Sequence, residues 1–345
     1  MAAFVEAIGV ISGLLGIVSF AQDNFGSGET SGSTYKFAVA LDGPGGTTNA
    51  GGDLPDVRVW NDVGKFVGMS VDPGKVKNGN LGEYSVDHEN QGVYSLFSAN
   101  DDAICVAWVT TTWSDDRGGN QYAVSGDYGE ACGGVWFESH MYPNADEEYQ
   151  PKCFWIDANG DQPQTGFQVR WPAFSKDSFD ENDTDPHRLC NGIDFGLREE
   201  EDPNSITYRT SKDRRNKLRV RQPPRRPAWA DSEIVISDAK QHSAKRLCQS
   251  DTSMGPDFAH TGEELFCDMD TKTLYAFCQV HDTETCFDLD SQSLLTPKHT
   301  QSNSTMGGNL RLATVHAAHL AAAPASASKS KYSSTRDWRS TSKKA

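Results

Sequence analysis

GVYSLFSANDDAICVAWVTTTW, at residues 92–113, contains two apolar runs separated by three polar residues. The runs at 92–99 and 103–113 are rich in β-branched and aromatic side chains, which favour a pleated, half-buried strand. Short runs of this composition bounded by Asn, Asp and Gly are the sequence signature of successive strands. The stretch therefore predicts two β-strands that follow one another along the chain.

The same pattern recurs from residue 34 to about residue 175. Further predicted strands are TYKFAVAL at 34–41, DVRVW at 56–60, KFVGMSV at 65–71, GVWFESHMY at 134–142, CFWIDA at 153–158 and GFQVRWPAF at 166–174. Alternating apolar residues, as at Tyr35, Phe37 and Val39, indicate that one face of a strand is buried. Strands at this spacing without helical periodicity are typical of a sandwich or a jelly roll. We therefore predict a mainly β protein with a β-sandwich or jelly-roll-like domain at 34–175.

The charge of the chain is unevenly distributed. In total, 32 Lys and Arg face 48 Asp and Glu, which gives a net charge of −16. Residues 209–226 hold nine basic residues and one acid, and residues 298–345 hold eight basic residues and one acid. The other 279 residues therefore carry −31. We expect an acidic body with two basic segments that are solvated, lie against the body or bind an anionic surface.

Composition excludes or disfavours three classes of protein. The 31 Gly and 15 Pro, together with the absence of heptads, exclude a coiled coil. No uncharged apolar stretch reaches ~20 residues, which excludes a membrane protein with several spans. Nucleic acid is not expected as a partner, because phosphate binding needs a net positive surface and this chain is acidic overall.

The N-terminal segment AAFVEAIGVISGLLGIVSFA, at 2–21, is apolar enough to face a membrane. Its uncharged run between Glu6 and Asp23 has 16 residues, which suits the apolar region of a signal peptide better than a spanning helix. Ser19 and Ala21 are small residues placed for cleavage before Gln22. Against cleavage, no Lys or Arg precedes the run. We predict either a signal peptide or an apolar helix at 1–21.

A retained helix would have a different role. Gly9 and Gly13, and likewise Ser12 and Gly16, form small-xxx-small pairs of the kind that let helices associate closely in lipid. Such a helix would bring the protein into contact with a membrane or with other copies. A third interpretation is a buried helix in a soluble fold.

Eight cysteines point to an oxidising compartment. They are Cys105, Cys132, Cys153, Cys190, Cys248, Cys267, Cys278 and Cys286. An even number at wide spacing suits a disulfide framework, and no Cys/His cluster has the spacing of a zinc site. The last four fall within 39 residues, so we expect them to pair among themselves and the first four to pair within the first domain. The alternative is a set of buried free thiols in a cytosolic protein.

Beyond the β-rich domain, the composition changes three times. Residues 22–33 are a Gly/Ser-rich linker, and residues 176–247 are predicted to be a charged linker with one strand, EIVIS, at 233–237. Residues 248–296 are predicted to form a small Cys-rich unit, which disulfides can stabilise without a large core. Residues 297–345, rich in Ala, Ser, Thr and Lys, are predicted to be a disordered basic tail.

Two kinds of modification site occur in these segments. Asn182 and Asn303 begin Asn-x-Thr sequons, which are compatible with glycosylation of a secreted protein. Lys245 and Arg246 form a dibasic pair at the boundary of the Cys-rich unit, which is a predicted processing site of a secreted protein. The alternative interpretation is an ordinary exposed basic pair.

Standard catalytic motifs are absent: the chain has no GxSxG, GxGxxG, P-loop or HExxH. Asp157, Asn159 and Asp161 place oxygen ligands at alternate positions of a predicted loop, which suits calcium as a cofactor. The sixth and twelfth positions are Gln162 and Gln168, which excludes an EF-hand. The alternative is a β-turn whose Asn and Asp side chains cap their own backbone.

Aromatic residues are dense in the predicted strands. The candidates for a ligand-binding platform are Trp108, Trp113, Trp136, Tyr142 and Trp155. Exposed rings beside carboxylates can stack on sugars, but the same rings can fill the core. Adjacent pairs such as Trp136-Phe137 point to opposite faces of a strand, so one ring needs a loop or the second domain to cover it.

Carboxylates supply the only candidate catalytic residues. Asp115 and Asp116 follow one predicted strand, and Glu138 lies in another. A pair of carboxylates can hydrolyse a glycosidic bond if their separation is suitable. The simpler interpretation is that they are exposed surface charges.

Three stretches resemble a group of uncharacterised proteins of filamentous fungi. They are IGVISGLLGIVSFAQDNF, GGVWFESHMYPN with YQPKCFWIDANGD, and RLCQSDTSMGPDF with ELFCDMDTKTLYAFC. The resemblance covers most of residues 1–290 and implies a fungal origin and secretion, but no activity and no catalytic residue. The first helix also resembles the apolar first helix of some fungal membrane-active domains.

We expect a secreted or cell-surface protein that binds its partner without catalysis. A glycan or cell-wall surface is the natural ligand, because aromatic and acidic residues share the predicted strands. One alternative is an extracellular hydrolase acting on polysaccharide. The other is a membrane-associated or self-assembling structural protein that acts through residues 2–21.

Overall fold

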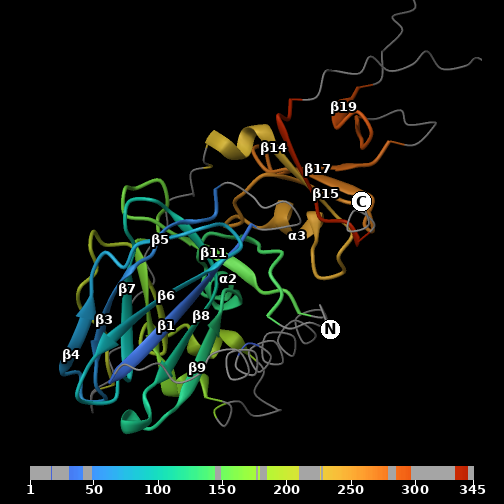
Figure 1. Ribbon diagram of the computed structural model, residues 1–345. Coiled ribbons are helices and arrows are strands. Elements are labelled where there is room, and N and C mark those ends of the chain that lie inside the picture. The colour runs from blue at the N-terminus through green and yellow to red at the C-terminus, as the bar shows by residue number, and fades with distance from the viewer. Residues whose placement is uncertain are drawn as a thin grey trace, which may run out of the picture.

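The structure is a computed structural model that describes residues 17, 31–41, 49–143, 149–175, 178, 185–209, 226, 228–278, 285–296 and 331–340. It confirms a mainly β protein with several antiparallel sheets. We call the described residues from 31 to 209 the N-terminal part and those from 226 to 340 the C-terminal part. Figure 1 shows the N-terminal part in blue to green and the C-terminal part in yellow to red.

Two sheets build the N-terminal part. The strand order of the first is β10-β11-β8-β1-β6, with β9 also paired to β8, and that of the second is β13-β12-β7-β3-β4. The first sheet comprises β1 (Gly32–Val39), β6 (Leu81–Asp87), β8 (Ile104–Trp113), β9 (Gln121–Ser125), β10 (Trp136–Glu138) and β11 (Lys152–Ile156). The second comprises β3 (Asp56–Trp60), β4 (Phe66–Ser70), β7 (Tyr94–Ser98), β12 (Gly166–Arg170) and β13 (Phe195–Arg198). A small separate ladder pairs β2 (Gly52–Asp53) with β5 (Lys75–Val76).

An aromatic core joins these two sheets. Phe37 of β1 and Phe97 of β7 meet edge to face with their ring centroids 5.0 Å apart. Phe97 lies 4.9 Å from Phe167 of β12, and Tyr35 of β1 lies 5.5 Å from Phe97. The alternating apolar residues of β1 therefore point into one shared core, as their period of two predicts.

Short helices occupy the connections. They are η1 (Asp115–Arg117), α2 (Asp127–Ala131), η2 (Trp171–Phe174), η4 (Pro186–Leu189), η5 (Ala228–Ser232) and α3 (Ala244–Gln249). Helix α2 packs on β11, and α3 packs on the sheet of the C-terminal part (Figure 1).

The C-terminal part contains one larger sheet. Its strand order is β17-β16-β15-β14-β20, and β14 pairs in parallel with both β15 and β20. The strands are β14 (Glu233–Ser237), β15 (Asp257–His260), β16 (Leu265–Asp268), β17 (Thr273–Ala276) and β20 (Ser334–Asp337). A hairpin of β18 (Cys286–Asp288) and β19 (Ser293–Leu295) lies beside it.

Two boundaries differ from the sequence-based expectations. The predicted linker 176–247 contributes β13 to the second sheet, and Gln168 binds the carbonyl of Thr207 at 2.7 Å, so 185–209 is part of the N-terminal part. The predicted tail 297–345 contributes β20, so disorder is wrong for residues 331–340. Both strands have only four residues and lie in segments of polar composition, and tertiary pairing stabilises them there. The strand predicted at 233–237 is present as β14.

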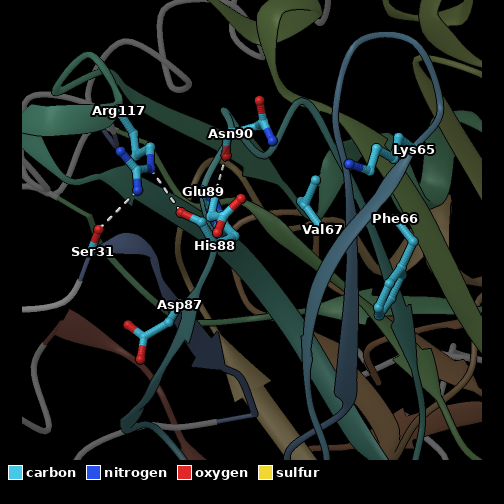
Figure 2. A pocket seen from close by; sticks show the side chains of 9 residues that line it. All are labelled: Ser31, Lys65, Phe66, Val67, Asp87, His88, Glu89, Asn90 and Arg117. Atoms are coloured by element: carbon cyan, nitrogen blue, oxygen red, sulfur yellow. Dashed lines mark hydrogen bonds between the residues drawn. The ribbon is translucent and has the colours of Figure 1, made fainter.

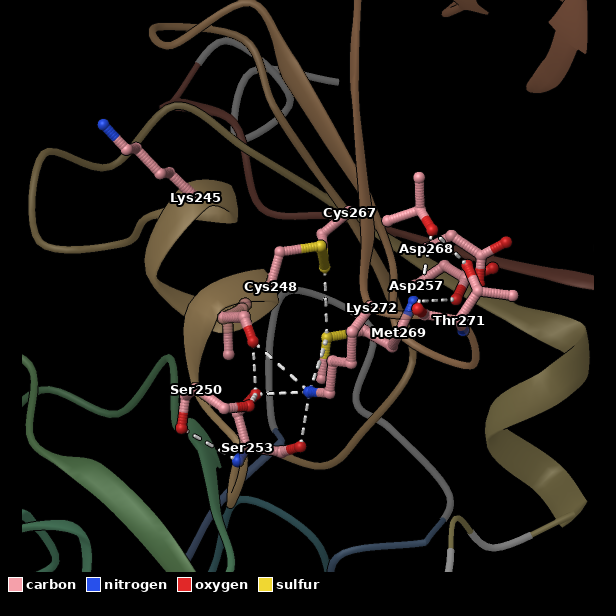
Figure 3. The surroundings of a disulfide bond; sticks show 12 residues. Lys245, Cys248, Ser250, Ser253, Asp257, Cys267, Asp268, Met269, Thr271 and Lys272 are labelled. Atoms are coloured by element: carbon pink, nitrogen blue, oxygen red, sulfur yellow. Dashed lines mark hydrogen bonds between the residues drawn. A yellow bond between two sulfur atoms is a disulfide. The ribbon is translucent and has the colours of Figure 1, made fainter.

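Four disulfides are present, in the two sets expected. Cys105–Cys153 and Cys132–Cys190 link the N-terminal part, whereas Cys248–Cys267 and Cys278–Cys286 link the C-terminal part. Cys248–Cys267 ties α3 to β16 (Figure 3). Disulfides of this number indicate an oxidising compartment.

Several expectations concern residues outside the described ranges. Of the segment 1–21, only Ile17 is described, and it is helical and buried in the main core. The sequon residues Asn182 and Asn303 and most of the basic segment 209–226 are also outside these ranges. In the part of the chain that is described, no helix has the length and apolarity needed to cross a membrane.

Candidate functional site

An open cavity of about 750 Å³ lies beside the edge strands β4 and β6. It is lined by Ser31, Lys65, Phe66, Val67, Asp87, His88, Glu89, Asn90 and Arg117 (Figure 2). Residues 65–67 come from the start of β4, residues 87–90 from the end of β6 and the loop after it, and Arg117 from η1. Segments far apart in the sequence therefore form this cavity.

His88 fixes the loop that forms the floor of the cavity. Its Nδ1 contacts the carbonyl of Asn90, and its Nε2 lies 2.8 Å from Oγ of Ser33. Because a carbonyl only accepts, Nδ1 carries the proton and Nε2 accepts from the serine hydroxyl. Burial lowers the pKa of His88, which agrees with a neutral ring. His88 is therefore a positioning residue for the polar side chains around it.

Arg117 connects three segments at the rim of the cavity. Its Nε donates to the carbonyl of His88 at 2.8 Å, and a terminal nitrogen donates to Oγ of Ser31 at 3.1 Å (Figure 2). The guanidinium also pairs with Asp116 at 3.1 Å. Hydrogen bonds from Ser114 and Ser31 and the charge of Arg117 lower the pKa of Asp116, so this carboxylate stays ionised. These contacts hold the Arg117 side chain in a fixed orientation at the cavity.

An apolar edge borders the polar residues. The ring of Phe66 is 47% exposed and leans edge-on against Trp60, with 5.7 Å between the ring centroids. The neighbouring side chains of Val63, Met69 and Val71 are also exposed. Large exposed apolar side chains are concentrated in this hairpin, and such patches commonly mark binding surfaces.

The tryptophans predicted to bind a ligand are core residues. Trp108, Trp113, Trp136 and Trp155 are all buried, so their faces are not available for stacking on a sugar. Tyr142 is half-buried, accepts a hydrogen bond from Gln150 and meets the ring of His140 edge to face. The expected aromatic platform is therefore wrong for the tryptophans, whose rings stabilise the fold.

Adjacent aromatic residues point to opposite faces of a strand, which is why the sequence suggested that one ring of each pair is exposed. Phe137 is covered by Phe258 of the C-terminal part, with 6.1 Å between ring centroids, and Trp155 is covered by Trp229 at 6.1 Å. Trp136 donates through Nε1 to Ser250 at 3.1 Å. The C-terminal part therefore covers the outer face of β10 and β11. Cover by a second domain is one of the sequence-based explanations for the adjacent aromatic pairs.

The predicted calcium loop makes the hydrogen bonds of a capped turn. The backbone N–H of Asp161 donates to Asp157 at 2.9 Å and to Asn159 at 3.1 Å, and Asn159 donates to the carbonyl of Asp101 at 2.7 Å. Among the residues that the structure describes, no group of three His, Cys, Asp or Glu side chains is arranged to hold a metal ion. The geometry favours the interpretation as a β-turn capped by its own side chains.

Glu138 lies in a buried cluster of charges. It is 2% exposed and pairs across the ladder with Lys152, whose Nζ lies 2.8 Å from Glu130 and 3.7 Å from Asp127. Desolvation raises the pKa of Glu138 to about 7, against the opposing charges of Lys152 and Arg246. A carboxyl group with such a pKa could exchange protons at neutral pH.

The structure separates Glu138 from the two aspartates. Glu138 pairs with Lys152, two residues before Phe154, and Phe154 pairs with Val106 of β8, so Glu138 lies level with the middle of β8 near Trp108. Asp115 and Asp116 follow the last residue of β8. The strand from Trp108 to Trp113 alone spans roughly 17 Å, which is too far for two carboxylates to act on one bond. The geometry therefore does not support a pair made of Glu138 and either aspartate.

The dibasic pair is part of a helix. Lys245 and Arg246 lie in α3, and Arg246 binds Glu130 at 3.1 Å while its guanidinium covers the ring of Trp136 at 5.6 Å. Processing proteases bind an extended, accessible chain, so the expectation of a cleavage site is not supported. Arg246 instead joins the two parts of the molecule.

Sequence inspection did not single out a Ser/Lys pair in the C-terminal part. Nζ of Lys272 lies 2.6 Å from Oγ of Ser253, and burial lowers the lysine pKa to about 8 (Figure 3). Such a pair could activate a nucleophile. Here the hydroxyl of Ser253 is buried and donates to the carbonyl of Leu247, so the pair stabilises the loop after α3.

Comparison with protein-family models finds no match, and comparison with curated proteins finds none. The function is therefore argued from geometry and chemistry. The cavity beside β4 and β6 is the best candidate site, because it is open and combines polar side chains with an exposed ring.

Proposed function

We propose that this chain is a secreted or cell-surface binding protein whose cavity beside β4 and β6 holds a polar, hydroxyl-rich ligand such as a cell-wall glycan. The observation that carries the proposal is the exposed ring of Phe66 in the same cavity as carboxylate, amide and guanidinium groups. Sugars present apolar C–H faces and polar edges, which require this combination of side chains.

The polar lining is suited to hydroxyl groups. Asp87 and Glu89 accept hydrogen bonds, Asn90 both donates and accepts, and Lys65 and Arg117 donate. Since the loop and Arg117 are held by their own hydrogen bonds, little ordering is needed when a ligand binds. Secretion is supported by the oxidised cysteines, which indicate an oxidising compartment.

The test is binding of the full chain to a glycan array, followed by calorimetry with the best ligand. The variants F66A and N90A are expected to weaken binding at least tenfold, because each removes one side of the cavity. V63A is the matched control, since Val63 is exposed on the same hairpin but does not line the cavity. The proposal fails if no glycan binds above background, or if V63A weakens binding as much as F66A.

An extracellular hydrolase remains a second candidate because of Glu138. Its pKa of about 7 beside Lys152 suits a proton donor or acceptor. Its burial argues against direct contact with a substrate. If E138Q abolished hydrolysis of a polysaccharide that the wild type cleaves, catalysis would replace binding as the function. The alternative that acts through residues 2–21 concerns a segment of which the structure describes only Ile17.

A further inference from the structure

The C-terminal segment 331–340 occupies the edge of the C-terminal sheet. Among the strands that the structure describes, β20 pairs with β14 alone, in parallel register from Glu233 beside Ser334 to Ile236 beside Asp337. The backbone N–H of Ser333 donates to Ser232 and that of Trp338 donates to Ile236, each at 2.8 Å. Addition of a strand to a sheet edge is a general mode of peptide recognition.

We propose that the edge of β14 is a peptide-docking site that also accepts segment 331–340 from a second copy of this chain. Copies would exchange their C-terminal strands and so associate. This interaction is independent of the cavity beside β4 and β6.

Trp338 is the anchor of the docked segment. Its side chain is 3% exposed and stacks on His140 with a centroid distance of 4.5 Å and an interplanar angle of 2°. His242 at 5.6 Å and Phe258 at 6.4 Å complete the surroundings of the ring. A buried tryptophan in a preformed aromatic site is typical of the residues that dominate binding energy.

Charge complementarity surrounds the anchor. Lys331 lies 2.8 Å from Asp257, and Arg336 lies 2.6 Å from Glu233. Both carboxylates are buried, so these pairs are poorly screened by salt. The site therefore favours an extended segment with two basic residues and a tryptophan, which is the pattern of this chain's own C-terminus.

The length of chain before the segment permits exchange. Thirty-four residues, 297–330, separate the described residues on either side, and a chain of that length spans at most roughly 115 Å. Flexible linkers in general give an intramolecular partner an effective concentration no higher than about the millimolar range. A second copy held at comparable local density, as on a crowded surface, can compete for the site.

The first test measures docking in trans with the synthetic peptide KYSSTRDWRS, residues 331–340, carrying a fluorescent label. It is added to the full-length chain and to full-length W338A, whose own segment lacks the anchor. We expect saturable binding to W338A at least tenfold tighter than to the wild type, and at least tenfold weaker binding of a peptide with alanine in place of its tryptophan. Equal affinity for the two chains, or no saturable binding to W338A, would overturn the proposal.

A second test uses charge reversal and does not depend on the folding of W338A. In E233R alone or R336E alone, the docked pair within each molecule becomes like-charged. When the two full-length variants are mixed, both exchanged pairs are complementary, so a dimer is expected by light scattering. The double variant E233R/R336E is the control and is expected to resemble the wild type. A mixture that stays as monomeric as each variant alone would contradict exchange.

Discussion

Lys152 is a buried cation that compensates the negative charges of the acidic side chains around it in the N-terminal part. Its side chain is 8% exposed and lies among Glu130, Asp127 and Glu138. Removing one partner of a buried ion pair leaves an uncompensated charge, which is more destabilising than losing an exposed pair.

We therefore predict that K152M lowers the free energy of unfolding by about 3 kcal/mol, because Glu130 and Asp127 lose a buried cationic partner. Urea unfolding measures this change. K245M is the control, since Lys245 is exposed on α3 and its loss should change stability by less than about 0.5 kcal/mol. Equal effects of the two substitutions would show that Lys152 is not compensating buried charge.

Glu138 should give stability a specific dependence on pH. Its pKa is raised to about 7 in the folded protein, so the folded state binds the proton more tightly than the unfolded state does. Stability from this group is present at acidic pH and is lost as pH rises through about 7. We predict that E138Q removes this loss. The measurement is unfolding of both proteins by urea from pH 4.5 to 8, and parallel curves would refute the prediction.

At the scale of the element, helix α2 shows how close packing restricts residue choice. A Cβ added at Gly129 would lie 2.2 Å from Cγ of Phe154 in β11. Alanine normally favours a helix by about 1 kcal/mol over glycine, but here the clash opposes that gain. We predict that G129A destabilises the protein by about 1–3 kcal/mol, as overpacking does. Thermal unfolding tests this, and a variant more stable than the wild type would contradict it.

The strands that sequence predicted are those with apolar or aromatic character. The runs at 34–41, 56–60 and 103–113 correspond to β1, β3 and β8. In the first sheet, the sequence-based prediction missed β6 and β9. In β6, LGEYSVD, buried and exposed positions alternate. Several of its residues are small or polar, such as Gly, Glu, Ser and Asp, so its composition does not distinguish it from a loop.

At the scale of the molecule, a histidine cluster joins the two parts. The rings of His140 and His242 lie 6.1 Å apart, and both contact Trp338. Burial lowers the pKa of His242 well below its ordinary value, and the charges of His140 and His260 add to this effect.

This cluster predicts loss of stability in acid. Because the unfolded state binds a proton near pH 6.5 and the folded state resists it, stability falls as pH drops below about 6.5. We expect the melting temperature of H242Q to fall less between pH 7 and pH 5 than that of the wild type. Comparison with H187Q, an exposed histidine, controls for general acid effects. A wild type and H242Q with the same pH dependence would refute the prediction.

The sequence by itself determined the β-rich class and the division of the cysteines into two sets. The β-rich class follows from local composition and from the periodicity of apolar side chains. The pairing of the cysteines in two sets follows from their short separations along the chain. The strand at 233–237 also followed from a local apolar run.

Only the tertiary structure decided which aromatic rings are buried, which carboxylates meet and which polar residues face a cavity. Trp136 is covered by residues more than 100 positions later, and the cavity brings β4 together with the loop after β6. Burial and the proximity of charges depend on segments that meet in space. A strand such as β20 is stabilised by pairing with β14 and not by its own composition. That dependence is why a segment of polar composition could be predicted as a tail and yet complete a sheet.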